Sequence, residues 1–198
     1  MKTDSLVLLA EKLKIKYVKN EAMSHHTSFK IGGDADIILY PENGEQLAEI
    51  LSVAKKENIP TFILGKGSNL LVSDNGIEGA VISTLAMQEI ALISDTEIKA
   101  EAGVTMAALC RAARDNGLTG LEFAYGIPGT VGGALYMNAG AYGGDMSMVV
   151  SSAESINKNF EAVTRSIDEM SLLFHQHLLS AVFLFAEGLL RFRLYTQH

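Results

Sequence analysis

The chain has 198 residues, of which 48% are hydrophobic, so it can bury a substantial core as one domain or two small ones. Its net charge of −7 argues against general nucleic-acid binding, because that activity needs a basic surface. The lone cysteine, Cys110, excludes an intrachain disulfide and is typical of a reducing compartment. Within the segment MAALCRAAR we expect it to be a small, buried thiol.

The sequence predicts neither a signal peptide nor a membrane-spanning segment. The first 14 residues contain Asp4 and Glu11 and no small-residue cleavage site, which indicates an amphipathic helix. The longest apolar stretch, residues 178–186, is shorter than the roughly 20 residues that a membrane helix needs. We therefore expect a soluble, cytoplasmic protein without a membrane partner.

Helical and extended patterns alternate along the chain. Apolar spacing predicts helices over residues 3–16, 45–58 and 105–116. Strands are expected at residues 28–31, 35–40, 61–64, 70–72, 80–83, 90–93, 98–102 and 152–156. Thr105 is the expected N-cap of its helix, and Gly117 lies just past the end. The mixture predicts an α+β fold with a seam near residue 85, which separates residues 1–85 from 86–171 and leaves an atypical tail, 172–198.

A first glycine-bearing loop, residues 65–74, reads GKGSNLLVSD and follows a short apolar strand. It lacks the Gly-Lys-Ser/Thr end of a P-loop and the sixth-position glycine of a dinucleotide fingerprint. The amides of Gly67, Ser68 and Asn69 can instead point together at an anion, with Lys66 adding positive charge. A tight turn that binds no ligand is the alternative.

A second glycine region, residues 126–144, reads GIPGTVGGALYMNAGAYGG, with seven glycines among 19 residues. Pro128 fixes its own φ, and Thr130 is placed to cap a short helix. Missing side chains there would allow a flat ring or a pyrophosphate to lie against the backbone. The alternative is a glycine-packed helix crossing without a cofactor.

Five segments occur in an order and spacing that resemble one bacterial enzyme family. They read HHTSFKIGGDAD (25–36), ILGKGSNLLVSD (63–74), EAGVT (101–105), GLTGLEFAYGIPGTVGGALYMNAGAYGG (117–144) and SAESIN (152–157). Together they resemble the UDP-N-acetylenolpyruvoylglucosamine reductases, flavoenzymes of peptidoglycan synthesis, over residues 5 to about 170. Either glycine motif alone would also fit the wider class of flavin domains named after vanillyl-alcohol oxidase.

The resemblance implies a two-subdomain FAD-binding domain of the vanillyl-alcohol oxidase type. It also implies the residues that hold the cofactor: Gly65, Lys66, Gly67, Ser68, Asn69, Leu70, Gly103, Tyr125, Gly126, Ile127, Pro128, Gly129, Thr130, Gly132, Gly133, Ala134, Asn138, Ala139 and Gly140. In the family reaction NADPH reduces FAD, and the reduced flavin passes hydride to the enolpyruvyl double bond of a UDP-sugar. The protein supplies position, electrostatics and a proton donor.

The sequence departs from the family pattern after residue 172. The family's catalytic Arg is not found there, where the chain reads LFHQHLLS, and the segment that carries its Ser acid, Glu and substrate domain is missing. The catalytic residues therefore stay unassigned. The tail ends in GLLRFRLYTQH, with neither clean alternation nor caps, and we hypothesise a truncated or frame-shifted product. Resequencing of the gene tests this, because an intact frame ending at His198 would contradict a frameshift.

Other residues are interpreted more simply. His175 and His177 lack the further ligands of a metal site, so no metal is expected. His25 and His26 are assigned a turn or surface role, and the oligomeric state is left open. Three hypotheses follow: an active reductase, an inactive FAD-binding fragment, and a glycine-rich interaction module without a cofactor.

Overall fold

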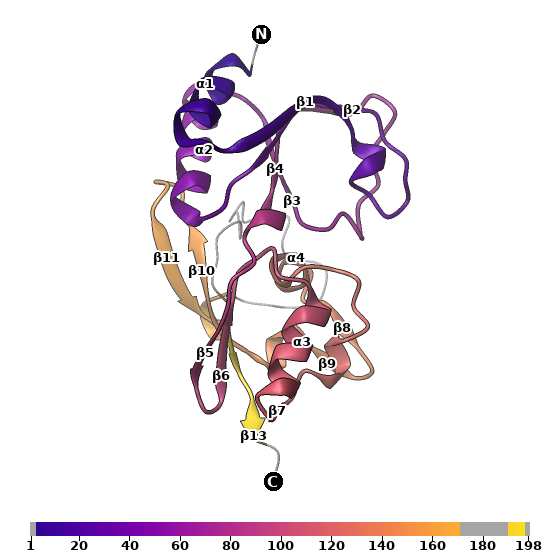
Figure 1. Ribbon diagram of the computed structural model, residues 1–198, viewed down its shortest axis with the longest axis vertical. Coiled ribbons are helices and arrows are strands. Elements are labelled where there is room, and N and C mark those ends of the chain that lie inside the picture. Colours follow the sequence, from indigo (N-terminus) through magenta and orange to yellow (C-terminus); the bar gives the residue numbers. More distant parts are fainter. Residues whose placement is uncertain (1–2, 171–189, 197–198) are drawn as a thin grey trace. The chain divides into compact units, whose positions relative to one another are not determined.

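The computed structural model describes residues 3–170 and 190–196. The chain divides into two compact units, Met1–Met87 and Gln88–His198 (Figure 1). Each unit combines a β-sheet with helices, so the predicted α+β class is confirmed. Most of the expected atypical tail, including His175 and His177, lies outside the described residues.

The first unit is built on a four-stranded sheet with the order β1-β2-β4-β3. Strand β1 is antiparallel to β2, whereas β4 is parallel to both β2 and β3. The strands are β1 Lys16–Ala22, β2 Asp34–Tyr40, β3 Thr61–Leu64 and β4 Ile77–Ser83. Ile37, Ile38 and Leu39 of β2 are consecutive and fully buried, so both faces of this central strand are covered.

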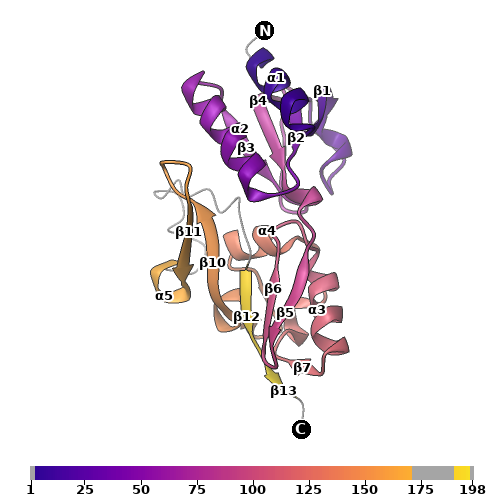
Figure 2. The ribbon, with the colours of Figure 1, turned by 60° about the vertical axis from the view of Figure 1, so that its left-hand side comes forward.

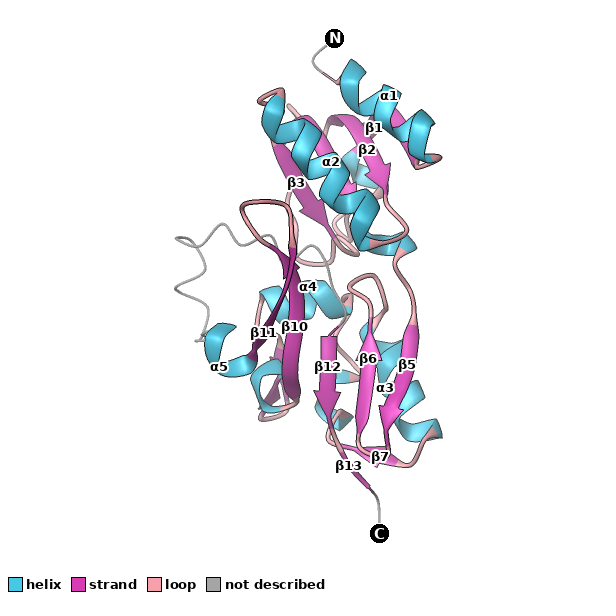
Figure 3. Ribbon diagram, turned by 90° about the vertical axis from the view of Figure 1, so that its left-hand side faces the viewer, coloured by secondary structure: helices cyan, strands magenta, loops and turns pink. Residues whose placement is uncertain are grey.

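Helices α1 (Asp4–Leu13) and α2 (Gly44–Lys56) lie over the same face of this sheet (Figure 3). Helix α2 begins where the Asn43 side chain accepts a hydrogen bond from the Gln46 amide. Its buried residues have helical spacing: Leu47, Ile50, Leu51 and Ala54. The expected helix over 3–16 is wrong at its end, because Lys14 has a left-handed φ of 57° and β1 begins at Lys16.

Two irregular loops complete the first unit, together with the 3₁₀ turns η1 (Met23–His25) and η2 (Thr84–Ala86). The expected strands at 28–31 and 70–72 are wrong, because both segments lie in these loops. Lys30 has a φ of 55°, which breaks the extended pattern. A small core beneath the loops contains Met23, Ala35, Ile38, Leu64, Val72 and Val81.

The second unit is built on an antiparallel five-stranded sheet with the order β11-β10-β12-β6-β5. Its strands are β5 Ile90–Ser94, β6 Glu97–Ala100, β10 Val150–Ile156, β11 Ala162–Ser166 and β12 Leu190–Arg193. Figure 2 shows β12 between β10 and β6. The expected strands at 90–93, 98–102 and 152–156 are confirmed within a few residues.

Strand β12 alternates between core and solvent, which corrects the expectation of no clean alternation near the end of the sequence. Leu190 and Phe192 are buried, whereas Arg191 and Arg193 are exposed. The same alternation continues into Leu194, which is buried. This pattern of period two fits a half-buried strand.

The remaining elements of the second unit surround one large core. They are α3 Met106–Asp115, β7 Leu118–Thr119, η3 Glu122–Ala124, α4 Val131–Tyr136, β8 Gly140–Ala141, β9 Gly144–Asp145, η4 Met146–Met148, α5 Ile167–Met170 and β13 Tyr195–Thr196. Strand β13 pairs with β7, and β8 pairs with β9. The core joins α3 (Met106, Leu109, Cys110) to β12 (Leu190, Phe192).

Candidate functional site

The first glycine loop runs from Gly65 to Gly76, between β3 and β4. Gly67 is buried at a φ of +66°, a conformation that glycine adopts without steric cost. A Cβ at this position would lie 1.9 Å from the carbonyl oxygen of His26. Glycine is therefore required at residue 67 both by its backbone angle and by its neighbour.

A second loop, residues 26–33, packs against this glycine loop. The Ser28 amide donates to the Gly67 carbonyl over 3.0 Å, and the Gly33 amide donates to the Ser73 carbonyl over 2.9 Å. The buried Thr27 hydroxyl donates to the Ile31 carbonyl over 3.1 Å, which closes the second loop on itself. The two loops thus form one hydrogen-bonded assembly, although they are about 40 residues apart in the sequence.

The glycine loop retains donors that could bind an anion. Within the part of the chain that the structure describes, the amides of Gly67 and Ser68 donate no recorded hydrogen bond. Gly67 is buried and Ser68 is half-buried, and successive amides in such a turn suit a phosphate oxygen. The exposed Lys66 side chain adds a positive charge to the same turn. These residues fit the pyrophosphate of a dinucleotide.

The second glycine region lies beside the turn that precedes α3. The Met106 amide donates to the Gly129 carbonyl, the Val131 amide to the Val104 carbonyl, and the Gly132 amide to the Ala102 carbonyl. Gly103 is buried within this turn. The structure therefore brings the predicted residues Gly103, Gly129, Thr130 and Gly132 together.

Two adjacent glycines of α4 have different surroundings. A Cβ on Gly132 would meet the Cβ of Ala102 at 2.8 Å, whereas one on the exposed Gly133 would meet only the Thr130 hydroxyl at 3.4 Å. Gly132 is thus needed for packing against the turn at Ala102. Gly133 leaves a bare stretch of backbone at the surface, where a flat ring could lie.

Asn138, Ala139 and Gly140 follow α4 as a tight connection. Asn138 has a φ of 42° and is 7% exposed, and its side-chain oxygen accepts from the Ser147 amide over 3.0 Å. The Ala139 amide donates to the Ala134 carbonyl. The Asn138 side chain therefore stabilises this loop through its hydrogen bond with Ser147.

The segment from Tyr125 to Pro128 is largely exposed, and Tyr125 borders a cleft of about 230 Å³ beside α3. Cys110 lies in the wall of this cleft and is buried, which confirms the expected environment of the thiol. Burial raises the pKa of the Cys110 thiol to about 11, and the nearby Glu122 charge acts in the same direction. A thiol in this state is unsuited to nucleophilic chemistry.

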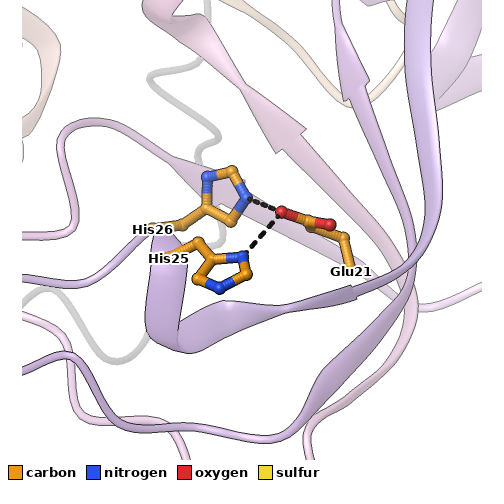
Figure 4. Close-up of polar contacts among 3 residues, drawn as sticks. All are labelled: Glu21, His25 and His26. Carbon is orange, nitrogen blue, oxygen red and sulfur yellow. Dashed lines mark hydrogen bonds and ion pairs between the residues drawn. The ribbon is translucent and has the colours of Figure 1, made fainter.

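Sequence reasoning missed one polar cluster next to the glycine loop. Glu21 accepts hydrogen bonds from the rings of His25 and His26 (Figure 4). Hydrogen bonds from His25 and then His26 lower the pKa of the Glu21 carboxyl. The spacing of four residues between Glu21 and His25 was the available signal. No group of three or more metal-binding side chains occurs among residues 3–170 and 190–196.

Residues 35–164 of this chain match the FAD binding domain family. That span includes both glycine regions and more than half of the sequence. The chain belongs to the FAD binding domain family. FAD is the cofactor of that family.

Individual relatives narrow the comparison. The UDP-N-acetylenolpyruvoylglucosamine reductases of Clostridium kluyveri and Clostridium tetani are 45% and 46% identical to this chain over 170 residues. Each match covers 85% of this chain and 56% or 55% of the relative. The chain therefore spans about half the length of the curated relatives it matches.

Solved structures give a consistent fold. The crystal structure of the UDP-N-acetylenolpyruvylglucosamine reductase from Thermus caldophilus superimposes with a TM-score of 0.74 and 26% identity, covering 93% of this chain and 63% of that one. An alkyldihydroxyacetonephosphate synthase matches with a TM-score of 0.60 and 15% identity, over 84% of this chain and 33% of that one. This second match supports the flavin-domain fold alone.

The helices in the described part of the chain are all too short or too polar to span a bilayer.

Proposed function

We propose that this chain is the FAD-binding part of a UDP-N-acetylenolpyruvoylglucosamine reductase. The main supporting observation concerns Gly67. Its left-handed backbone and close approach to His26 fix a turn in which the Gly67 and Ser68 amides donate no hydrogen bond to any described residue. The loop sequence around it also belongs to the pattern that this chain shares with reductases at 45–46% identity.

The proposal assigns cofactor binding to each unit in turn. The loop from Gly65 to Leu70 would hold the pyrophosphate, with Lys66 supplying positive charge and the amides of Gly67 and Ser68 donating hydrogen bonds. In the second unit, the exposed backbone around Gly133 would lie against a flat part of the cofactor. Residues 1–85 and 86–171 would be the two subdomains of this binding unit.

Bound FAD would supply hydride-transfer chemistry, while the chain binds and orients the cofactor. NADPH is the proposed hydride donor and UDP-N-acetylglucosamine enolpyruvate the proposed acceptor. The product, UDP-N-acetylmuramate, is a precursor of peptidoglycan, so the proposal includes a cytoplasmic location. The residues that protonate the substrate are unassigned in this chain.

An FAD titration of the purified chain is the first test. We expect saturable binding of one FAD per chain. Quenching of flavin fluorescence and a shift in visible absorbance would report the binding. Soluble, folded protein that binds no FAD would contradict the proposal. This result would favour the glycine-rich interaction module.

FAD binding without turnover is a second candidate, favoured by the match to about half the length of the relatives. Oxidation of NADPH, followed at its near-ultraviolet absorbance with and without the enolpyruvyl UDP-sugar, separates the two. Substrate-dependent oxidation supports the reductase. FAD binding with no such oxidation supports the inactive fragment.

A further inference from the structure

Glu21, His25 and His26 form a polar bridge at the end of β1. One oxygen of Glu21, Oε1, lies 3.1 Å from Nδ1 of His25 and 3.2 Å from Nε2 of His26 (Figure 4). With a proton on each of these ring nitrogens, both histidines donate to the same carboxylate oxygen. The His26 side chain is 19% exposed and that of Glu21 is 29% exposed, so this side of the bridge is partly withdrawn from solvent.

The main chain of His26 is also the wall against which Gly67 packs. The position of a Cβ on Gly67 is 1.9 Å from the His26 carbonyl oxygen and 3.2 Å from the Cα of Thr27. The Ser28 amide then donates to the Gly67 carbonyl. The peptide groups at residues 26–28 therefore set where the glycine loop lies.

The bridge adds a side-chain restraint to the turn that carries His26. Turn η1 contains three residues, and its end is closed by a hydrogen bond from the His26 amide to the Met23 carbonyl. Short 3₁₀ turns have poorer hydrogen-bond geometry than an α-helix. A side-chain anchor on His26 thus limits how far its carbonyl can move against Gly67.

We propose that Glu21 is a positioning residue for the phosphate-binding loop. By holding His26, it fixes the backbone wall that keeps the amides of Gly67 and Ser68 directed at the pyrophosphate. This inference rests on the proposed FAD site, and it assigns to that site a residue from strand β1 of the same unit. It predicts that cofactor affinity depends on a carboxylate that need not touch the cofactor.

Substitution of Glu21 tests the role as a hydrogen-bond acceptor. We expect Glu21→Ala to weaken FAD binding about tenfold, the scale of losing two modest hydrogen bonds. Glu21→Gln keeps an accepting oxygen and should restore affinity to within about twofold of the wild type. His26→Ala should resemble Glu21→Ala, whereas His25→Ala should cost less, since the carbonyl against Gly67 belongs to His26.

Tyr17→Phe is the matched control. It removes an exposed hydrogen bond from the same strand, the one from the Tyr17 hydroxyl to Glu11, and should leave FAD affinity unchanged. Thermal unfolding of each variant shows whether affinity and stability change separately. Equal FAD affinity in the wild type and in Glu21→Ala would overturn the inference, as would a failure of Glu21→Gln to rescue.

Hydrogen exchange of the FAD-free chain gives a readout that does not require the cofactor. We expect the amides of Ser28 and Gly33, which donate to the Gly67 and Ser73 carbonyls, to exchange faster in Glu21→Ala than in the wild type or Glu21→Gln. Equal exchange rates would overturn the inference even if no FAD binds. If Glu21→Ala exchanges faster than the wild type but the wild type binds no FAD, the positioning role of Glu21 stands and the proposed cofactor is refuted.

Discussion

Thr105 and Thr130 face each other in an isolated antiparallel β-bridge, and each is the N-cap of the helix that follows it. The Thr105 side chain accepts from the Ala108 amide over 3.2 Å, and the Thr130 side chain accepts from the Gly133 amide over 3.4 Å. One contact therefore links the starts of α3 and α4. It also holds the bare backbone at Gly133 in a defined place.

Loss of the Thr130 cap should destabilise the second unit. Thr130 is fully buried, and Thr130→Val keeps its shape while leaving the Gly133 amide without its acceptor. We expect the free energy of unfolding to fall by about 1 kcal/mol. Urea denaturation followed by circular dichroism measures it. Thr164→Val, on the exposed face of β11, is the control and should have little effect; equal losses in both variants would contradict the capping role.

Substitution of Gly67 should weaken FAD binding, whereas substitution of a glycine with a similar backbone angle should not. Gly117 has a similar φ of +69°, but nothing lies within 4 Å of its Cβ position. Gly117→Ala should cost about 1 kcal/mol of stability through its backbone angle and leave FAD affinity unchanged. Gly67→Ala adds a clash with the His26 carbonyl, and we expect FAD binding to weaken by about tenfold or more. Titration of both variants with FAD decides the matter, and equal affinities would refute the loop role of Gly67.

Local signals in the sequence predicted the caps and the strands nearest to the site. Thr105 and Thr130 stand just before helices, where a side-chain oxygen pairs a free amide, and both are confirmed as N-caps. The apolar run at residues 61–64 is confirmed as β3. The proposed cofactor residues themselves stay a prediction, which the FAD titrations test.

Elements that depend on distant partners could not be predicted in the same way. The sequence of strand β1, KYVKNEA, has no apolar alternation, and none of its residues is fully buried. The strand forms because it pairs with β2. Residues 28–31 alternate like a strand, but the bond from Thr27 to the Ile31 carbonyl closes them into a loop. The partners of β12, at Ala100 and Ala153, are far away in the sequence, so no local pattern indicates them.

The buried thiol should respond to pH and to alkylating reagents. Burial raises the pKa of Cys110 from 9.0 to about 11, so at about pH 8 roughly one thiol in a thousand is ionised. We expect Cys110 to react slowly with a thiol reagent in the folded chain and rapidly in guanidinium chloride. Fast labelling of the folded chain would contradict this environment, and Cys110→Ser supplies the blank.

The same pKa shift affects stability at alkaline pH. The folded state binds the thiol proton more tightly than the unfolded chain, so this contribution is fully present below pH 9 and is lost as the pH rises to about 11. We expect Cys110→Ser to have a flatter dependence of the melting temperature on pH in that window. Parallel curves for the two proteins would contradict the shift.

Phe192 tests whether β12 carries part of the core of the second unit. Its side chain is fully buried within the cluster that also contains Met106 and Leu109. Phe192→Ala removes a large buried side chain and should lower the free energy of unfolding by about 3–5 kcal/mol. Urea denaturation measures the change, with refolding checked because a loss of this size approaches the stability of a small domain.

Arg191 on the same strand provides the control, since its side chain is exposed while its main chain pairs with Lys99 and Ser152. Arg191→Ala should change stability by no more than about 0.5 kcal/mol. A large difference between the two variants requires one face of β12 to be buried. Small and equal effects would mean that residues 190–193 lie outside the sheet, and β10 would then lose its partner on the side of β6.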